Sequence, residues 1–254
     1  MKYRFAIERE DYSDYASGRV LYSAPGHPAF PVRLASEAFQ RCLSVRESRG
    51  GHGPCLLYDP CCGAATHLTT LGFLHGDAIG EIIASDIDGD ILQLAERNLG
   101  LLTPAGLAGR IDEITRMLSQ YGKPSHEEAL AGAKRLRARI CRLTDRRGVA
   151  SKTFRADAGN GDALIRGLGR RKADVVFADV PYGQHSAWQT TGDAGAAGAD
   201  PLWRMLEALR PVLSEGAVVV IASDKGQRPA HNGYRRTERF QVGRRRITML
   251  QPAG

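Results

Sequence analysis

The sequence predicts an α/β fold built on a mostly parallel sheet that carries helices on both faces. After residue 50, short apolar runs alternate with helical patterns, as the crossover connections of a parallel sheet require. These runs are rich in Ile and Val and lack strict polar alternation, which is typical of strands buried on both faces. The last two strand-like segments lie too close together for a crossover, so an antiparallel hairpin should end the sheet.

The order of these elements follows from the same patterns. Strands are expected at 55–59, 81–86, 151–156, 173–179 and 217–222, and the hairpin at 234–241 and 244–251. Helices are expected at 64–74, 89–99, 162–168 and 201–213. In the last of these helices Asp200 is the expected N-cap and Pro201 the first helical residue.

Two segments lie outside this alternation. Residues 1–50 mix aromatic, proline-containing and helical stretches, and we interpret them as an N-terminal extension of a main domain at 51–254. Residues 103–150 separate the second and third strands by more than a crossover requires. Helical periodicity at 107–121 and 125–143, broken between them by Gly122 and Pro124, predicts a helical hairpin inserted there.

Basic residues are gathered rather than spread, within a formal net charge of +7. They dominate residues 134–155, where Asp145 is the single acid, and form smaller clusters at 166–172 and 235–246. A basic run is often only a solvated helix face, but three clusters favour a polyanionic partner. The second arm of the insertion is the first candidate for contact with RNA, through Arg135, Arg139, Arg142, Arg146 and Arg147.

Composition restricts the location and the class of the protein. The five cysteines include no C-x-x-C pair and lack the histidine spacing of a zinc site, so we expect free thiols and no metal. No apolar stretch has the length of a signal peptide or a membrane span. We therefore expect a monomeric cytoplasmic protein with no membrane partner, whose 43% apolar residues are enough for a substantial core.

The first strand ends in Asp59-Pro60-Cys61-Cys62-Gly63 and runs directly into a helix. A tight turn of small residues before a helix N-terminus suits the carboxylate of a ligand. The turn does not read G-x-G-x-x-G, and a pyrophosphate needs closer backbone approach than cysteines readily allow. A dinucleotide-dependent dehydrogenase is therefore disfavoured.

Acidic residues also end the next two strands. Asp86 can accept hydrogen bonds from both hydroxyls of a ribose, whereas Asp88 is better placed as a helix N-cap. Asp157 could accept from the exocyclic amine of an adenine. Each aspartate alone is common at strand and helix ends, but the ordered series predicts a nucleoside-binding edge.

The fourth strand ends in Asp179-Val180-Pro181-Tyr182. A carboxylate and a backbone carbonyl fixed by proline can accept from the N–H groups of a base, and the aromatic ring can stack on its face.

At these motifs the sequence resembles class I S-adenosylmethionine-dependent methyltransferases that methylate amino groups. That family carries D-P-x-C-G-S-G-T after the first strand and [N/D]-P-P-[Y/F] after the fourth. The matching residues here are Asp59, Pro60, Cys62, Gly63, Thr66, Asp179, Pro181 and Tyr182. Val180 replaces the first proline, and Ala64 and Ala65 replace Ser and Gly.

The resemblance implies a Rossmann-like, seven-stranded sheet and a catalytic set of Asp179, Pro181 and Tyr182. It implies that the matching residues of the first motif bind S-adenosylmethionine together with Asp86, Ile87, Asp157 and Ala158. As a whole, the chain is similar to the family of avilamycin-resistance methyltransferases that act on a guanine of large-subunit (23S) ribosomal RNA. Methyl transfer to a guanine nitrogen would then be direct, without a metal, and the base would leave its stack to reach the pocket.

Other functions stay open on the sequence alone. Cys61 or Cys62 could be the nucleophile of a pyrimidine methyltransferase, although both sit in the cofactor turn. The same tetrapeptide chemistry also serves methylation of another RNA or DNA base, or of a protein glutamine. A non-catalytic RNA-binding module is the last alternative, and the intact set of Asp59, Asp86 and Asp179 disfavours it.

Overall fold

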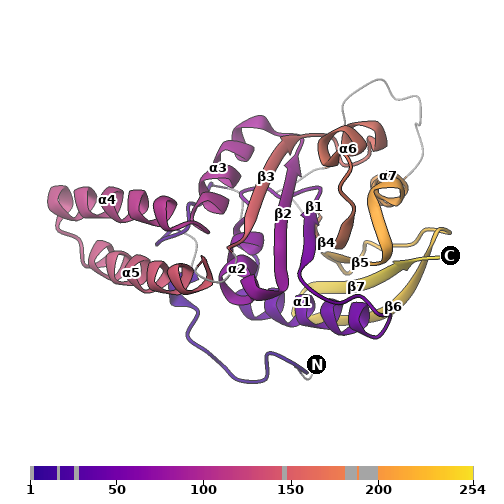
Figure 1. Ribbon diagram of the computed structural model, residues 1–254, viewed down its shortest axis with the longest axis horizontal. Coiled ribbons are helices and arrows are strands. Elements are labelled where there is room, and N and C mark those ends of the chain that lie inside the picture. The colour runs from indigo at the N-terminus through magenta and orange to yellow at the C-terminus, as the bar shows by residue number, and fades with distance from the viewer. Residues whose placement is uncertain are drawn as a thin grey trace.

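A seven-stranded sheet forms the centre of the protein (Figure 1). The computed structural model describes residues 3–15, 18–25, 29–144, 148–180, 188 and 200–253. The strands are β1 (Cys55–Asp59), β2 (Ile79–Asp86), β3 (Ala150–Arg155), β4 (Ala173–Asp179), β5 (Leu213–Asp224), β6 (Tyr234–Val242) and β7 (Arg245–Pro252).

The strand order is β3-β2-β1-β4-β5-β7-β6. The first five strands in this order pair in parallel, whereas β7 is antiparallel to both of its neighbours. The predicted α/β class, the parallel core and the C-terminal antiparallel hairpin are therefore confirmed. The order reverses between β1 and β4, and ligands of such folds bind at the carboxyl ends of the strands at this point.

Helices cover both faces of the sheet (Figure 1). One hydrophobic cluster joins a face of the sheet to α1 (Val32–Glu47), α2 (Thr66–His75) and α3 (Gly89–Gly100). A second cluster joins the other face to α6 (Gly161–Leu168) and α7 (Pro201–Leu209). Neighbouring residues of one strand pack into different clusters. Leu57 belongs to the first cluster and Tyr58 to the second, and both side chains are fully buried.

The helical hairpin expected between the second and third strands is present as α4 (Pro104–Tyr121) and α5 (Pro124–Thr144). It projects from the β3 side of the sheet (Figure 1). Thr103 caps α4 by accepting a hydrogen bond from the N–H of Gly106 over 3.0 Å. Gly122 ends α4 at a φ of 58°, a left-handed conformation that costs glycine little.

Two of the helix boundaries that differ from the prediction have clear local reasons. α2 begins at Thr66 rather than at residue 64, because Ala65 has a left-handed φ of 53°. α7 ends at Leu209 rather than at residue 213, because Pro211 lacks a backbone donor and its ring opposes a continuing α-helix. The predicted N-cap is confirmed, since Asp200 accepts from the N–H of Leu202 over 3.0 Å.

The N-terminal segment packs against α1. The buried carboxylate of Glu37 accepts hydrogen bonds from three successive backbone N–H groups, those of Arg4, Phe5 and Ala6, over 2.8–2.9 Å. The division into an extension at 1–50 and a domain at 51–254 with an insertion stays a prediction. None of the helices in the described ranges is long and apolar enough to cross a membrane.

Candidate active site

The turn after β1 is held from within and from the neighbouring strand. Oδ1 of Asp59 accepts from the N–H of Cys61 over 2.8 Å, and the N–H of Cys62 donates to the carbonyl of Ser85 on β2 over 2.9 Å. The left-handed conformation of Ala65 turns the chain into α2. The family pattern carries glycine at this position, so the backbone geometry is present here without its usual residue. The first backbone N–H groups of α2 have no partner within the helix and can bind a carboxylate.

Asp86 at the end of β2 is tied to this turn. Its Oδ2 accepts from the N–H of Gly63 over 2.8 Å, and its Oδ1 accepts from the N–H of Asp88 over 3.0 Å. Burial raises the pKa of Asp86, although both hydrogen bonds lower it. Each carboxylate oxygen keeps a second lone pair, so Asp86 can still accept from ribose hydroxyls.

Asp88 is confirmed as the N-cap of α3, since its carboxylate accepts from the N–H groups of Asp90 and Ile91. Ile87 lies half-buried between the two aspartates, and its carbonyl accepts from Nε of Arg155 over 2.8 Å.

Asp157 follows β3 and lies beside Ala158 with its side chain almost buried. Its Oδ1 accepts from the N–H of Gly159 over 2.8 Å, which shapes the loop that leads to α6. The N–H of Ala156 donates to the carbonyl of Asp86 over 3.0 Å, so the ends of β2 and β3 are held together. Both acids expected to bind the nucleoside therefore lie at one edge of the sheet.

Asp179 ends β4, next to β1 in the sheet. Burial raises the pKa of its carboxyl to about 6, while the charges of His67 and Arg245 lower it. Its Oδ1 is buried without a hydrogen-bond partner among the described residues. A buried acceptor of this kind is costly unless a ligand donates to it. Pro181 and Tyr182, the other two residues of the predicted catalytic set, lie outside the described residues.

Cys61 lies among all four strand-end aspartates. Burial raises the pKa of its thiol well above the usual value, and the charges of Asp59, Asp86, Asp157 and Asp179 raise it further. The sheet thus brings together acids that are far apart in the sequence. The thiol pKa of Cys62 is also raised by burial and by neighbouring acids. A thiolate nucleophile is therefore disfavoured at both positions.

His67 is a residue of this site that sequence reasoning assigned only to a helix. Its Nε2 lies 3.0 Å from Oδ2 of Asp59, and its ring centroid lies 5.3 Å from that of Phe177 on β4. Burial lowers the pKa of His67, but contacts with Asp59 and the charge of Asp179 outweigh burial, so the net shift is upward. The available signal was its place in the first turn of the helix after the motif.

The arginines that were expected to contact RNA differ from one another in their contacts within the protein. Arg135 donates to both oxygens of Asp14, and Arg139 donates to the carbonyls of Phe73 and Leu74 at the end of α2. These two side chains hold parts of the protein together. Arg142 is exposed, while Arg146 and Arg147 lie outside the described residues. The contact of α5 with RNA stays a prediction.

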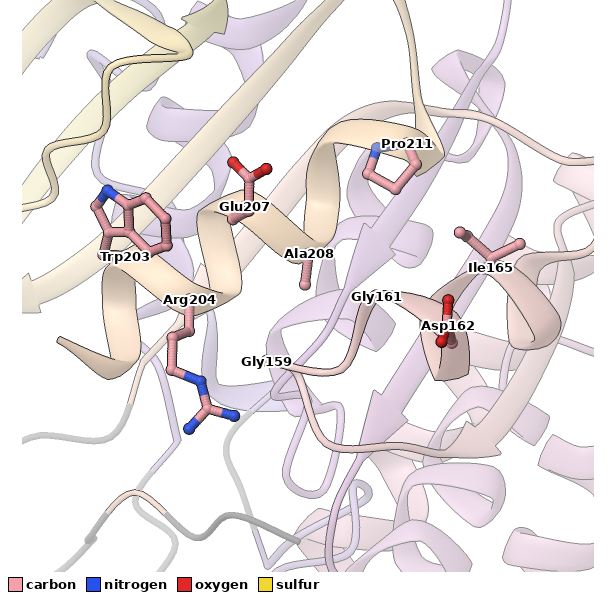
Figure 2. A pocket seen from close by; sticks show the side chains of 9 residues that line it. All are labelled: Gly159, Gly161, Asp162, Ile165, Trp203, Arg204, Glu207, Ala208 and Pro211. Atoms are coloured by element: carbon pink, nitrogen blue, oxygen red, sulfur yellow. The ribbon is translucent and has the colours of Figure 1, made fainter. Parts of the chain in front are cut away.

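A pocket of about 330 Å³ lies between α6 and α7 (Figure 2). Figure 2 shows Arg204 and Trp203 on α7 and Asp162 and Ile165 on α6 around it. The pocket reaches Gly159, two residues after Asp157, but none of the four strand-end aspartates lines it. It therefore borders the candidate active site without containing its carboxylates.

The sheet is parallel except for the reversed strand β7. The tight turn after β1 and the acids at four adjacent strand ends can provide partners for the carboxylate, ribose and adenine of one ligand. Of these four acids, Asp179 at the end of β4 has a buried oxygen without a hydrogen-bond partner among the described residues. The fold is that of the class I S-adenosylmethionine-dependent methyltransferases.

Comparison with known proteins gives the family. The family model described as rRNA methyltransferase AviRa matches residues 1–245, and the chain belongs to this family. A 23S rRNA (guanine(2535)-N(1))-methyltransferase of Streptomyces viridochromogenes is 41% identical over 252 residues, covering 99% of this chain and 96% of the relative. Two solved structures of the rRNA methyltransferase AviRa from that organism superpose with TM-scores of 0.85 and 0.86. Both are 39% identical and cover 98% of this chain and 96% of theirs.

Proposed function

We propose that this protein transfers a methyl group from S-adenosylmethionine to N1 of a guanine in 23S ribosomal RNA. Such a modification would protect the ribosome against an antibiotic of the avilamycin type. The observation that carries the proposal is the buried Oδ1 of Asp179 at the end of β4, which has no hydrogen-bond partner among the described residues and lies beside the strand ends that can hold the cofactor. The relative that acts on N1 of a guanine supports the choice of atom.

The residues present fit the cofactor. The N–H groups at the start of α2 suit its carboxylate, Asp86 suits the ribose, and Asp157 beside Ala158 suits the adenine. We assign Pro60, Cys62, Gly63, Thr66 and Ile87 to the walls of the same site because they form the turns between these groups. When bound, S-adenosylmethionine supplies a methyl group that its sulfonium already activates.

The protein must supply alignment and a proton acceptor. N1 of a neutral guanine carries a proton, which has to leave for its lone pair to attack. With a pKa of about 6, Asp179 is ionised at neutral pH and can accept that proton. The charge of His67, which lies 3.0 Å from Asp59, favours the ionised form of Asp179, whereas the charge of Asp59 opposes it. We assign the stacking of the base to Tyr182 and an accepting carbonyl to the segment at Pro181, as the motif implies.

Alternative functions are less well supported. Methylation of another base would use the same carboxylate but a different pattern of donors. Methylation of a protein glutamine requires no polyanion-binding surface, and the chain carries three basic clusters. A non-catalytic RNA-binding module would not need a buried acid with a raised pKa. We also propose that the protein acts as a monomer in the cytoplasm, on ribosomal RNA.

The test is methylation of unmodified 23S rRNA transcribed in vitro. Incubation of the RNA with the protein and isotope-labelled S-adenosylmethionine, followed by nucleoside mass spectrometry, should give labelled 1-methylguanosine. A labelled N2-methylguanosine or methylated adenosine would contradict the assignment of the atom or of the base. Transfer to protein alone would contradict the assignment of RNA.

A further inference from the structure

The cations of the C-terminal hairpin differ in their contacts from those of α5. The β6–β7 hairpin and the segment before it carry eight basic side chains, and we name five of them the hairpin cationic face: Lys225, Arg228, Arg236, Arg239 and Arg246. Four of the five are exposed, and Arg246 is half-buried and donates to the carbonyl of Gln227 over 3.1 Å. None of the five forms an ion pair with an acid in the described part of the chain.

The strand register places the three arginines on one side of the sheet. Arg236 pairs with Leu250 and Arg239 with Thr248, so both point to the face on which Leu250 packs. Arg246 lies two residues before Thr248 and therefore shares that face. The acid of β6, Glu238, points to the opposite face, where it contacts Arg41. The hairpin cationic face is consequently free of carboxylates from its own strands.

The connection from β5 to β6 crosses β7 on this face, where Arg246 donates to the carbonyl of Gln227, and four of the five cations stay exposed. β6 runs parallel to β5 with β7 between them, so residues 225–233 must cross β7 from one edge of the sheet to the other. A helix could cover the sheet here, but these residues form neither a helix nor a strand. Thr248 is nevertheless buried, which the aliphatic stems of neighbouring arginines can achieve while their charged ends stay in water.

The hairpin cationic face reaches the edge of the sheet at which Asp179 lies. Asp179 pairs with Ala222 on β5, and Ala222 pairs with Ile247 on β7. Arg246 and Arg245 therefore lie one and two residues beyond this row, at the same edge of the sheet as Asp179. Arg245 precedes Arg246 in β7 and therefore points to the opposite face, and its charge lowers the pKa of Asp179.

We propose that the hairpin cationic face binds the sugar–phosphate backbone of the RNA that carries the target base. Cations that reach the edge of the sheet at Asp179 would hold the backbone beside that edge on the β7 side and leave the base free to enter the site. The structural roles of Arg135 and Arg139 leave α5 with fewer side chains for such contacts. The inference rests on the proposed function in taking RNA as the partner.

The experiment is the salt dependence of binding to unmodified 23S rRNA transcribed in vitro. The test variant carries Arg236→Gln and Arg239→Gln. The matched control carries Arg166→Gln and Arg170→Gln, which removes two exposed arginines near the end of α6, at the edge of the sheet opposite Asp179. Losing two phosphate contacts should lower the slope of log Kd against log salt by about 1.4–1.8. The control should keep the wild-type slope.

Affinity for S-adenosylmethionine, measured by calorimetry, checks that each variant is folded. If the first variant fails to fold, Lys225→Gln with Arg228→Gln tests the same surface outside the strands and should lower the slope as well. Equal slopes for the hairpin variants, the control and wild type would overturn the proposal. Failure of the proposed function would give a different result. In that case the wild-type protein would bind the RNA but would produce no methylated guanosine.

Discussion

The backbone N–H of Gly63 donates a hydrogen bond to Oδ2 of Asp86 over 2.8 Å. This contact joins the turn after β1 to the end of β2, so the carboxylate expected to hold the ribose also fixes the loop expected to hold the cofactor carboxylate. Two binding elements that are separated in the sequence are therefore set in position by one side chain.

Asp86→Ala should weaken cofactor binding by on the order of 1.5–3 kcal/mol, because the ribose loses a charged acceptor and Gly63 loses its partner. Asp86→Asn keeps one accepting oxygen and should lose less. Calorimetric titration with S-adenosylmethionine measures both effects. Unchanged affinity in Asp86→Ala would remove Asp86 from the site.

Cys61→Ser and Cys62→Ser should both retain methyl transfer. Burial raises the thiol pKa of both cysteines, so neither is a thiolate at neutral pH and neither sulfur has to form a bond. Single-turnover transfer to 23S rRNA is the measurement, with cofactor affinity as the control. Loss of transfer with intact cofactor binding would support a covalent mechanism instead.

Asp179→Asn should stabilise the protein more at pH 7.5 than at pH 4.5. The folded-state pKa of about 6 lies above the ordinary value of 3.8, so folding favours the protonated carboxyl. Wild-type stability therefore falls as pH rises from about 4 to about 6, by up to about 3 kcal/mol, whereas the amide does not titrate in this window. Urea unfolding of both proteins at the two pH values measures the difference. A pH-independent difference would contradict the raised pKa.

Arg139→Ala should destabilise the protein by about 1–2 kcal/mol, because the guanidinium donates to two carbonyls at the C-terminal end of α2. Arg137→Ala on the same helix removes an exposed arginine and should change stability by less than about 0.5 kcal/mol. Thermal unfolding compares the two. Equal small effects would show that Arg139 is available for RNA after all.

Much of the fold could be predicted because its causes are local. Buried strands with their β-branched residues, the Asp200 cap and the short link between the last two strands each leave a signal within a few residues. The prediction was wrong where one residue overrides the surrounding pattern. Pro211 ends α7 early, and Ala65 takes a left-handed conformation that an alanine in the sequence does not predict.

The site residues that could be predicted from the sequence are the acidic residues at the ends of strands. Asp59, Asp86, Asp157 and Asp179 were found because parallel strands bring their carboxyl ends to one edge. His67 was missed because its significance lies in its distance from Asp59, which no spacing rule supplies. In the same way, the contact of Arg139 with the end of α2 could not be predicted, because a basic helix face does not reveal which of its members bind carbonyls of the same chain.

The central claim is that Asp179 accepts the proton of the target nitrogen, and single-turnover methyl transfer to 23S rRNA tests it most directly. In wild type the rate should fall about tenfold per pH unit below about pH 6, because a protonated carboxyl cannot act as the base. Asp179→Ala should abolish most transfer while cofactor and RNA binding persist, since other groups supply that affinity. Transfer by Asp179→Ala at the wild-type rate, with an unchanged pH profile, would contradict the account.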